Sequence, residues 1–326
     1  MLTDYGLSVS RSFTAGGQDW ALYQSPNRYF EQLLSIPRSV VFRRLATTCL
    51  PLTLWAACIE AASETWPEIL DFPVGQPFQF VGGAISLLLV FRTNSAYGRF
   101  NAARNSWADV TCHCRNLARK VYTWFPSEDE SDMRERAARI LCALPWALKA
   151  RVQGYEGTEF AREQLTAILG RKTIEHIWRS DGRTVNVSML LLREFNMLIN
   201  ELNEHGGHPI YQLLMDNDLT NLQSQIAKQD RIISTPTPLS YTRHTSRSLM
   251  VWLILLPFSY SQTLGWEVVP TVFLISYILL GIDDIGIQIE YPFTILPLKE
   301  ICEEIEGEIL QEVDLKSMVN GVRQES

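Results

Sequence analysis

The sequence predicts an all-α membrane protein in which two hairpins of apolar helices flank a long, more polar helical segment. The first observation is a pair of gaps in the basic residues, because no Lys or Arg occurs between Arg44 and Arg92 or between Arg247 and Lys299. Each gap of about fifty residues holds two apolar stretches, and a membrane-spanning helix needs about 20 mostly apolar residues. The second observation is the absence of any useful length of the apolar/polar alternation that marks a strand.

The two gaps predict four spans, arranged as two hairpins. The first pair covers residues 45–62 and 77–91, joined by an acidic link with Glu64, Glu68 and Asp71. The second pair covers residues 248–264 and 268–281, joined by a short link around Trp266. Pro51 and Pro257 fall inside two of the spans, where we expect proline to interrupt the helix.

Basic residues flank the first three spans on the side away from the links, and this asymmetry orients the hairpins. The flanking residues are Arg28, Arg38, Arg43, Arg44, Arg92, Arg99, Arg104, Arg115, Arg119, Lys120, Arg243 and Arg247. By the positive-inside rule, both termini and the middle segment lie on the cytosolic side, or on the stromal side of a plastid. A soluble protein with buried apolar helices is the alternative, because each span alone is ambiguous. The repeated pattern favours the membrane.

Helical periodicity continues outside the hairpins. We expect helices at residues 101–123, 131–152, 160–177, 185–202, 211–232 and 298–319, the last amphipathic with a glutamate-rich face. We therefore divide the chain into an N-terminal segment (1–38), a first hairpin with a candidate pore helix (39–100), a helical cytosolic or stromal domain (101–240), a second hairpin (241–290) and a C-terminal helix and tail (291–326).

The composition argues against several classes of function. A net charge of −7 and the lack of a basic block argue against a nucleic-acid partner. No nucleophile motif, phosphate loop or dinucleotide fingerprint occurs, so we expect no enzyme activity and no catalytic residues. Cys112-His113-Cys114 lacks the second ligand pair of a typical metal site. The histidines of the Glu204–His208 tract lie beside two glycines, which favours a solvated turn. We expect no metal.

The span at 77–91 differs from a plain membrane anchor, because it combines small residues with an aromatic side chain. Gly82, Gly83 and Ala84 share this helix with Phe80. Small residues allow close packing of helices in a bilayer. Alternatively, copies of the helix surround a water-filled path, and Phe80 forms a ring that constricts it. The residues alone leave both accounts open.

Charged residues mark the expected membrane boundary. Asp283 and Asp284 end the fourth span, and Glu290 follows them. Ionisable residues at this depth are costly and normally face protein or water. We expect the two aspartates to pair with Arg92 or Arg99.

Three separated motifs resemble the bestrophin family of channels. They are LLVFRTNSAYGRF at 88–100, PTPLSYTR at 236–243 and GIDDIGIQIEYPF at 281–293. The resemblance covers about residues 25 to 315, in order. It is strongest to the bestrophin-like, voltage-dependent chloride channels of plant and algal thylakoids and to their bacterial relatives.

The resemblance implies a homopentamer with one axial anion pore, four membrane helices per subunit and a wide cytosolic vestibule. The family's upper constriction, the neck, falls on Gln76, Phe80 and Ala84. Only Phe80 keeps a bulky apolar side chain, so the resemblance implies a wider or wetter neck than in vertebrate members. The lower constriction, the aperture, is placed near Val187.

The resemblance also implies which ions take part. Vertebrate members bind calcium through acidic residues after a motif that here reads Tyr291-Pro292-Phe293, and the following residues, 294–298, carry no carboxylate. We therefore expect no calcium clasp and no cofactor. Chloride is the expected permeant ion and bicarbonate the alternative. A non-conducting membrane scaffold is the rival function. The thylakoid membrane is the favoured location, with a bacterial plasma membrane as the alternative.

Overall fold

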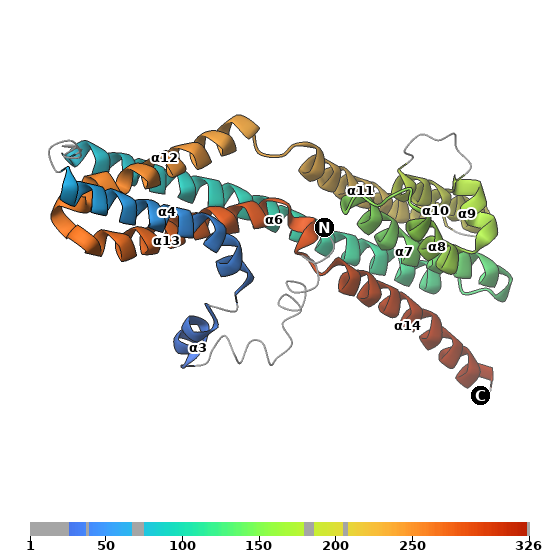
Figure 1. The fold of residues 1–326 in the computed structure, drawn as a ribbon. Coiled ribbons are helices and arrows are strands. Elements are labelled where there is room, and N and C mark those ends of the chain that lie inside the picture. Colours follow the sequence, from blue (N-terminus) through green and yellow to red (C-terminus); the bar gives the residue numbers. More distant parts are fainter. Residues whose placement is uncertain (1–25, 37–38, 67–74, 179–185, 205–207, 325–326) are drawn as a thin grey trace. The chain divides into compact units, whose positions relative to one another are not determined.

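The computed structural model describes residues 26–36, 39–66, 75–178, 186–204 and 208–324, apart from the side chains of residues 75, 76, 128 and 314–324. Within these ranges all regular structure is helical and no strand occurs, so the all-α expectation is confirmed (Figure 1). The α-helices are α3 (Arg28–Ser35), α4 (Val40–Thr65), α6 (Gly75–Trp124), α7 (Ser131–Val152), α8 (Glu159–Leu169), α9 (Arg171–Trp178), α10 (Val187–Glu204), α11 (Pro209–Ser234), α12 (Leu239–Leu264), α13 (Val268–Glu290) and α14 (Leu298–Gln324). Short 3-10 turns occupy Glu128–Glu130 (η3), Gly265–Glu267 (η4) and Pro292–Thr294 (η5).

The chain divides into two units. The first, which we call the hairpin unit, comprises Ala15–Phe100 and Pro236–Pro292. The second, which we call the middle unit, comprises Met1–Thr14, Asn101–Thr235 and Phe293–Ser326. The long helix α6 begins in the hairpin unit and ends in the middle unit.

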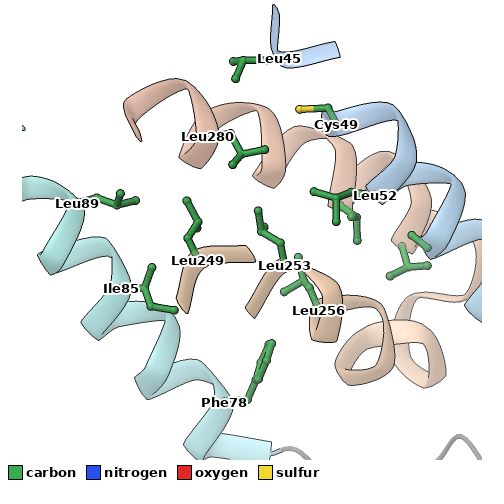
Figure 2. Packing of buried hydrophobic residues seen from close by; sticks show 13 residues of the cluster. Leu45, Cys49, Leu52, Phe78, Ile85, Leu89, Leu249, Leu253, Leu256 and Leu280 are labelled. Atoms are coloured by element: carbon green, nitrogen blue, oxygen red, sulfur yellow. The ribbon is translucent and has the colours of Figure 1, made fainter. Parts of the chain in front are cut away.

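In the hairpin unit, α4 packs against both α13 and α12, and these two helices also pack against each other. Figure 2 shows the core that they form with the start of α6. Side chains of all four helices meet there, and the cluster contains Leu45, Cys49, Leu52, Ala56, Phe78, Ile85, Leu89, Leu249, Leu253, Leu256, Val268, Val272 and Leu280. This apolar burial holds the helices together within one subunit.

Two stretches of this unit are long and apolar enough to cross a membrane, judged by length and composition. They are Val40–Thr65 and Leu239–Glu290, the second of which includes both α12 and α13. Their outward faces also carry large apolar side chains, such as Leu54 and Leu274, which are 66% and 57% exposed. Large apolar residues that remain outside a well-formed core mark a surface that something other than water covers.

Two prolines lie inside these helices without ending them. We expected Pro51 and Pro257 to interrupt their spans, but α4 and α12 continue through them. Proline is tolerated in membrane helices because neighbouring helices and Ser/Thr side chains satisfy the freed backbone groups. The expectation of a break was therefore wrong, and α7 of the middle unit likewise continues through Pro145.

In the middle unit, α7 is the central helix, with α8, α10, α11 and α14 packed against it. Nearly every residue from Ala137 to Val152 is buried, which explains the apolar character of this stretch. The single helix expected at residues 160–177 is in fact two, α8 and α9, separated by Gly170. Gly170 has a φ of +82°, a conformation that other residues adopt only with strain.

The stretches expected at 77–91 and 101–123 belong to one helix of 50 residues, α6. The change from apolar to polar residues around Arg92 suggested a boundary between two elements. That change concerns the surroundings of the side chains, whereas residues 92–100 contain no proline, and the helix continues through the single glycine, Gly98. A polar boundary is therefore no reason for the helix to end.

Candidate pore-lining face and boundary charges

The first part of α6 has one packed face and one uncovered face. Successive helical residues are rotated by about 100°, which places Phe78, Ile85 and Leu89 within about 40° of one another. All three are buried, and Figure 2 shows them directed at Leu249, Leu253 and Leu256 of α12. The opposite side of α6, about 160° away, remains open within this subunit.

The uncovered face of α6 carries the predicted neck residues. Phe80 is 75% exposed, Ala84 is also exposed, and Leu87 and Phe91 continue the same face. The side chain of Gln76 lies outside the described residues. An aromatic ring exposed on a helix whose other face is fully packed is expensive in water. The described residues of this chain do not cover this face.

The adjacent glycines of α6, Gly82 and Gly83, have different surroundings. A Cβ atom added to Gly82 would lie 2.7 Å from Cζ2 of Trp252, whereas one added to Gly83 would meet nothing within 4 Å. The Trp252 ring stacks on Phe78 with centroids 5.2 Å apart, and its Nε1–H donates to the Phe78 carbonyl at 3.2 Å. Gly82 thus makes room for Trp252 of α12, a partner that sequence reasoning missed.

This difference predicts unequal effects of two alanine substitutions. Gly82→Ala should destabilise the protein by about 1–3 kcal/mol, because the new methyl group overlaps the indole in a packed core. Gly83→Ala is the matched control, one residue away on the same helix, and should leave stability nearly unchanged. Thermal unfolding of the purified protein in detergent, followed by tryptophan fluorescence, measures both. Equal melting temperatures for the two variants would contradict the assigned packing.

Arg92 and Asp283 form a buried ion pair between α6 and α13. Arg92 is 5% exposed and Asp283 is 8% exposed. The guanidinium Nη1 donates to Asp283 Oδ1 and lies 3.3 Å from Ser246 Oγ, which in turn lies 3.4 Å from Asp283 Oδ2. The expected pairing of Asp283 with Arg92 is confirmed, and Ser246 of α12 joins it.

Asp284 has a different partner from the one we expected. It pairs with Arg44 of α4 at 3.3 Å, and Gln288 donates to its Oδ2 at 2.6 Å. The prediction that Asp284 pairs with Arg92 or Arg99 was therefore wrong. Successive helical residues point about 100° apart, so two adjacent aspartates cannot share one cation on a neighbouring helix.

Arg99 and Glu290 are also neighbours, through the backbone. Arg99 Nε donates to the Glu290 carbonyl at 3.2 Å, and Thr237 donates its hydroxyl to the Glu290 carboxylate. The boundary charges thus join α4, α6 and α13, together with residues at the start of α12. These contacts connect the helices at the end of the hairpin unit where its basic residues lie.

Val187 lies at the start of α10 in the middle unit. Its side chain is 5% exposed, and its N–H donates to Glu156 Oε1 at 3.0 Å. Within one chain this side chain packs in the core and does not line an open surface. The placement of the aperture at Val187 stays a prediction.

The residues of the Cys112–Cys114 motif take part in polar contacts and packing within the middle unit. His113 Nδ1 lies 3.0 Å from Asp218 Oδ1, and Lys120 Nζ lies 2.6 Å from the other oxygen of that carboxylate. Cys112 is exposed and Cys114 is buried, and burial raises the pKa of the Cys114 thiol to about 12. No group of three or more His, Cys, Asp and Glu residues in the described part of the chain is placed to hold a metal ion.

A surface hollow of about 290 Å³ lies between α6 and α14 in the middle unit. Arg115 and Arg119 line it on one side, and Glu308 and Glu312 on the other. Arg115 already pairs with Glu308 and, at 3.1 Å, with Glu304. Because its charges neutralise one another, the hollow offers no strong attraction to an anion.

Known proteins resemble this chain over most of its length. The family model described as "Bacterial/Fungal Bestrophin protein" matches residues 21–311. A voltage-dependent anion channel-forming protein of Nostoc sp. is 32% identical, over 78% of this chain and 82% of the relative. Voltage-dependent chloride channel 2, chloroplastic, of Arabidopsis thaliana is 29% identical, over 93% of this chain and 73% of the relative.

A solved structure agrees with these sequence relatives. It is a bacterial bestrophin homologue from Klebsiella pneumoniae with a single mutation, 28% identical to this chain. The superposition has a TM-score of 0.76 and covers 83% of this chain and 99% of the other. The matched residues 21–311 include the helices of the hairpin unit and most of those of the middle unit.

Proposed function

This chain belongs to the bestrophin family, and we propose that it is an anion channel in which five copies surround one axial pore. The observation that carries the proposal is the division of α6 into a packed face and an uncovered face that bears Phe80. A rotational axis beside that face brings one copy of it from each subunit around a common path. The channel names of the relatives support the same function.

The proposed neck consists of Gln76, Phe80 and Ala84. A ring of Phe80 side chains presents an apolar constriction, and such constrictions gate by dewetting. The positive edge of an aromatic ring also suits an anion better than its negative face does. Gln76 and Ala84 add little apolar bulk, so the neck is narrow only at Phe80. The pore is wider or wetter at Gln76 and at Ala84.

The proposed membrane topology has four spans: α4, the start of α6, α12 and α13. The hydropathy of Val40–Thr65 and Leu239–Glu290 supports three of them. The start of α6 is less apolar, as suits a helix with one side against its own subunit and one side against water. Both basic flanks then face the cytosol or stroma. The thylakoid membrane is the favoured location, with a bacterial plasma membrane as the alternative.

We propose passive conduction of chloride, with bicarbonate as the second candidate, and no catalysis or cofactor. Calcium control through the family's acidic site is not part of the proposal. The residues that follow Pro292, 293–298, carry no carboxylate, and Phe293, Ile295, Leu296 and Leu298 are all buried. Calcium takes six to eight oxygen ligands, which these side chains do not offer.

The test is reconstitution of the purified protein into planar bilayers with chloride, bicarbonate or gluconate, with calcium chelated. We expect current carried by chloride and bicarbonate and much less by gluconate, because the larger organic anion does not pass the Phe80 ring. Size-exclusion chromatography with light scattering gives the number of subunits in the same sample. A well-folded pentamer that carries no anion current would reject the channel and favour the non-conducting scaffold.

A further inference from the structure

The short helix α3 has an apolar face that no described residue of the hairpin unit covers. Tyr29, Phe30, Leu33 and Leu34 are all strongly exposed, and none of the eight residues of α3 is buried. Helical rotation of about 100° per residue places these four on one arc, with Glu31 and Gln32 on the other side. Figure 1 shows α3 extended away from α4. A surface of this kind on so short a helix needs a partner.

The position of α3 in the chain limits what that partner is. Only residues 36–39 separate Ser35, the last residue of α3, from the start of α4 at Val40. At about 3.5 Å per residue, α3 ends within about 17 Å of the first turn of α4. If α4 spans the membrane, as the proposed function requires, α3 is within reach of the lipid headgroups.

The same end of the hairpin unit carries positive charges that no described side chain pairs with. Arg43, Arg243 and Arg247 are exposed, and none of their side chains bonds to a described residue of this chain. They lie beside the Arg92–Asp283–Ser246 cluster and the Arg44–Asp284 pair, which mark this end. The opposite end of the unit, around Glu64 and Glu267, is acidic. The end that bears α3 thus attracts anionic headgroups.

We propose that α3 is an interfacial anchor, which lies along the cytosolic or stromal surface of the bilayer. Its apolar face inserts among the acyl chains through Tyr29, Phe30, Leu33 and Leu34. Anionic headgroups bind around Arg43, Arg243 and Arg247. Helices of this type bury their apolar face about 5–10 Å deep, at the boundary of headgroups and acyl chains. The hydroxyl of Tyr29 accepts from Arg28 at 2.6 Å, so this pair keeps its polar atoms together at the rim of the apolar face.

The test places a fluorescent label on each face of α3 in the full-length protein. Cys58→Ala and Cys112→Ser remove the two exposed thiols. Of the cysteines that remain, all buried, burial raises the pKa of Cys114 and Cys142 to about 12, which leaves them unreactive. Leu33→Cys then carries the label on the apolar face, Leu34→Cys is a second site there, and Gln32→Cys is the matched control on the polar face.

The labelled proteins are reconstituted into vesicles and exposed to three quenchers: iodide in the water and lipids spin-labelled at a shallow or a deep acyl carbon. We expect the label at Leu33 to be quenched most by the shallow lipid and little by iodide, and the label at Gln32 to show the reverse order. The fluorescence emission of the label at Leu33 shifts to the blue when the label enters an apolar environment. This shift should be larger in vesicles that contain phosphatidylglycerol than in vesicles of phosphatidylcholine alone.

Two outcomes would overturn the anchor, and a third would overturn the proposed headgroup binding. Equal iodide quenching at Leu33 and Gln32 would place α3 in water. Protection of Leu33 and Leu34 from all three quenchers would place them against protein, as in a contact with a second copy of the chain. Equal blue shifts in the two lipids would remove the role of anionic headgroups. Because quenching needs no conduction, a protein that carries no current but shows the expected pattern would reject the channel and keep the anchor.

Discussion

Replacing Asp283 by alanine should lower the free energy of unfolding by about 3–5 kcal/mol, because the change leaves the Arg92 charge buried without its counter-ion. The guanidinium cannot lose its proton to escape this cost. Ser246 Oγ, at 3.3 Å, remains its polar neighbour but carries no negative charge. Unfolding of the purified protein in mixed detergent micelles, followed by circular dichroism, measures the loss.

A matched control lies one residue away. Asp284 pairs with Arg44, whose side chain is 37% exposed and keeps access to solvent when its partner is removed. Asp284→Ala should therefore cost only about 0–1 kcal/mol. The contrast between two adjacent aspartates separates the effect of burial from any general effect of removing negative charge at this end of α13.

A double substitution tests whether the pair acts as a unit. Asp283→Leu combined with Arg92→Met replaces both charges by apolar side chains of similar size, and well-packed replacements of buried pairs are often neutral or stabilising. We expect the double variant to be more stable than either single variant. Strictly additive losses would show that the two side chains are not coupled, and would refute the contact between α6 and α13.

The positions of the apolar helices could be predicted from sequence because their signal is local. The gaps in Lys and Arg gave spans that lie inside α4, α12 and α13, and each of these helices extends several residues further at one or both ends. In the middle segment, the periodicity of residues 131–152 predicted the bounds of α7. In each case the signal lies within the helix itself, because the number and spacing of its apolar residues indicate where it begins and ends.

Features that depend on distant parts of the chain could not be predicted in the same way. Arg44 and Asp284 are separated by 240 residues, and no local pattern indicates which cation Asp284 meets. Trp252 covers Gly82 only because α12 lies against α6. The glycine pair in α6 was consistent with close helix packing and with a pore-lining helix, and the sequence did not distinguish the covered glycine from the open one.

The predicted neck differs from both the local and the long-range features, because its test needs more than one copy of the chain. Which residues of α6 face away from their own subunit follows from the fold, and Phe80 and Ala84 are among them. Whether that face meets water on an axis, lipid or another subunit depends on assembly. The identity of the neck therefore stays a prediction, and conduction by altered channels is the measurement that decides it.

Phe80→Ala should raise the chloride conductance of single channels several-fold. In the proposed pore, five Phe80 rings form the one bulky apolar level of the neck, and their removal lets water fill it. Each 1.4 kcal/mol by which the barrier to ion passage falls corresponds to about a tenfold change in rate. Selectivity against gluconate should weaken in the same variant, because the narrowest level becomes wider. Single-channel recording in planar bilayers measures both effects.

Leu54→Ala supplies the control for this variant. Leu54 is 66% exposed on α4, so its truncation removes a comparable outward apolar side chain without touching α6. If Leu54 faces lipid, its loss leaves conductance and ion preference unchanged. Ala84→Phe provides the opposite change on the proposed pore face and should lower conductance by adding a second aromatic ring level. Conductance that responds to Leu54 as strongly as to Phe80, or that ignores Phe80 and Ala84 alike, would mean that the uncovered face of α6 points away from the ion path.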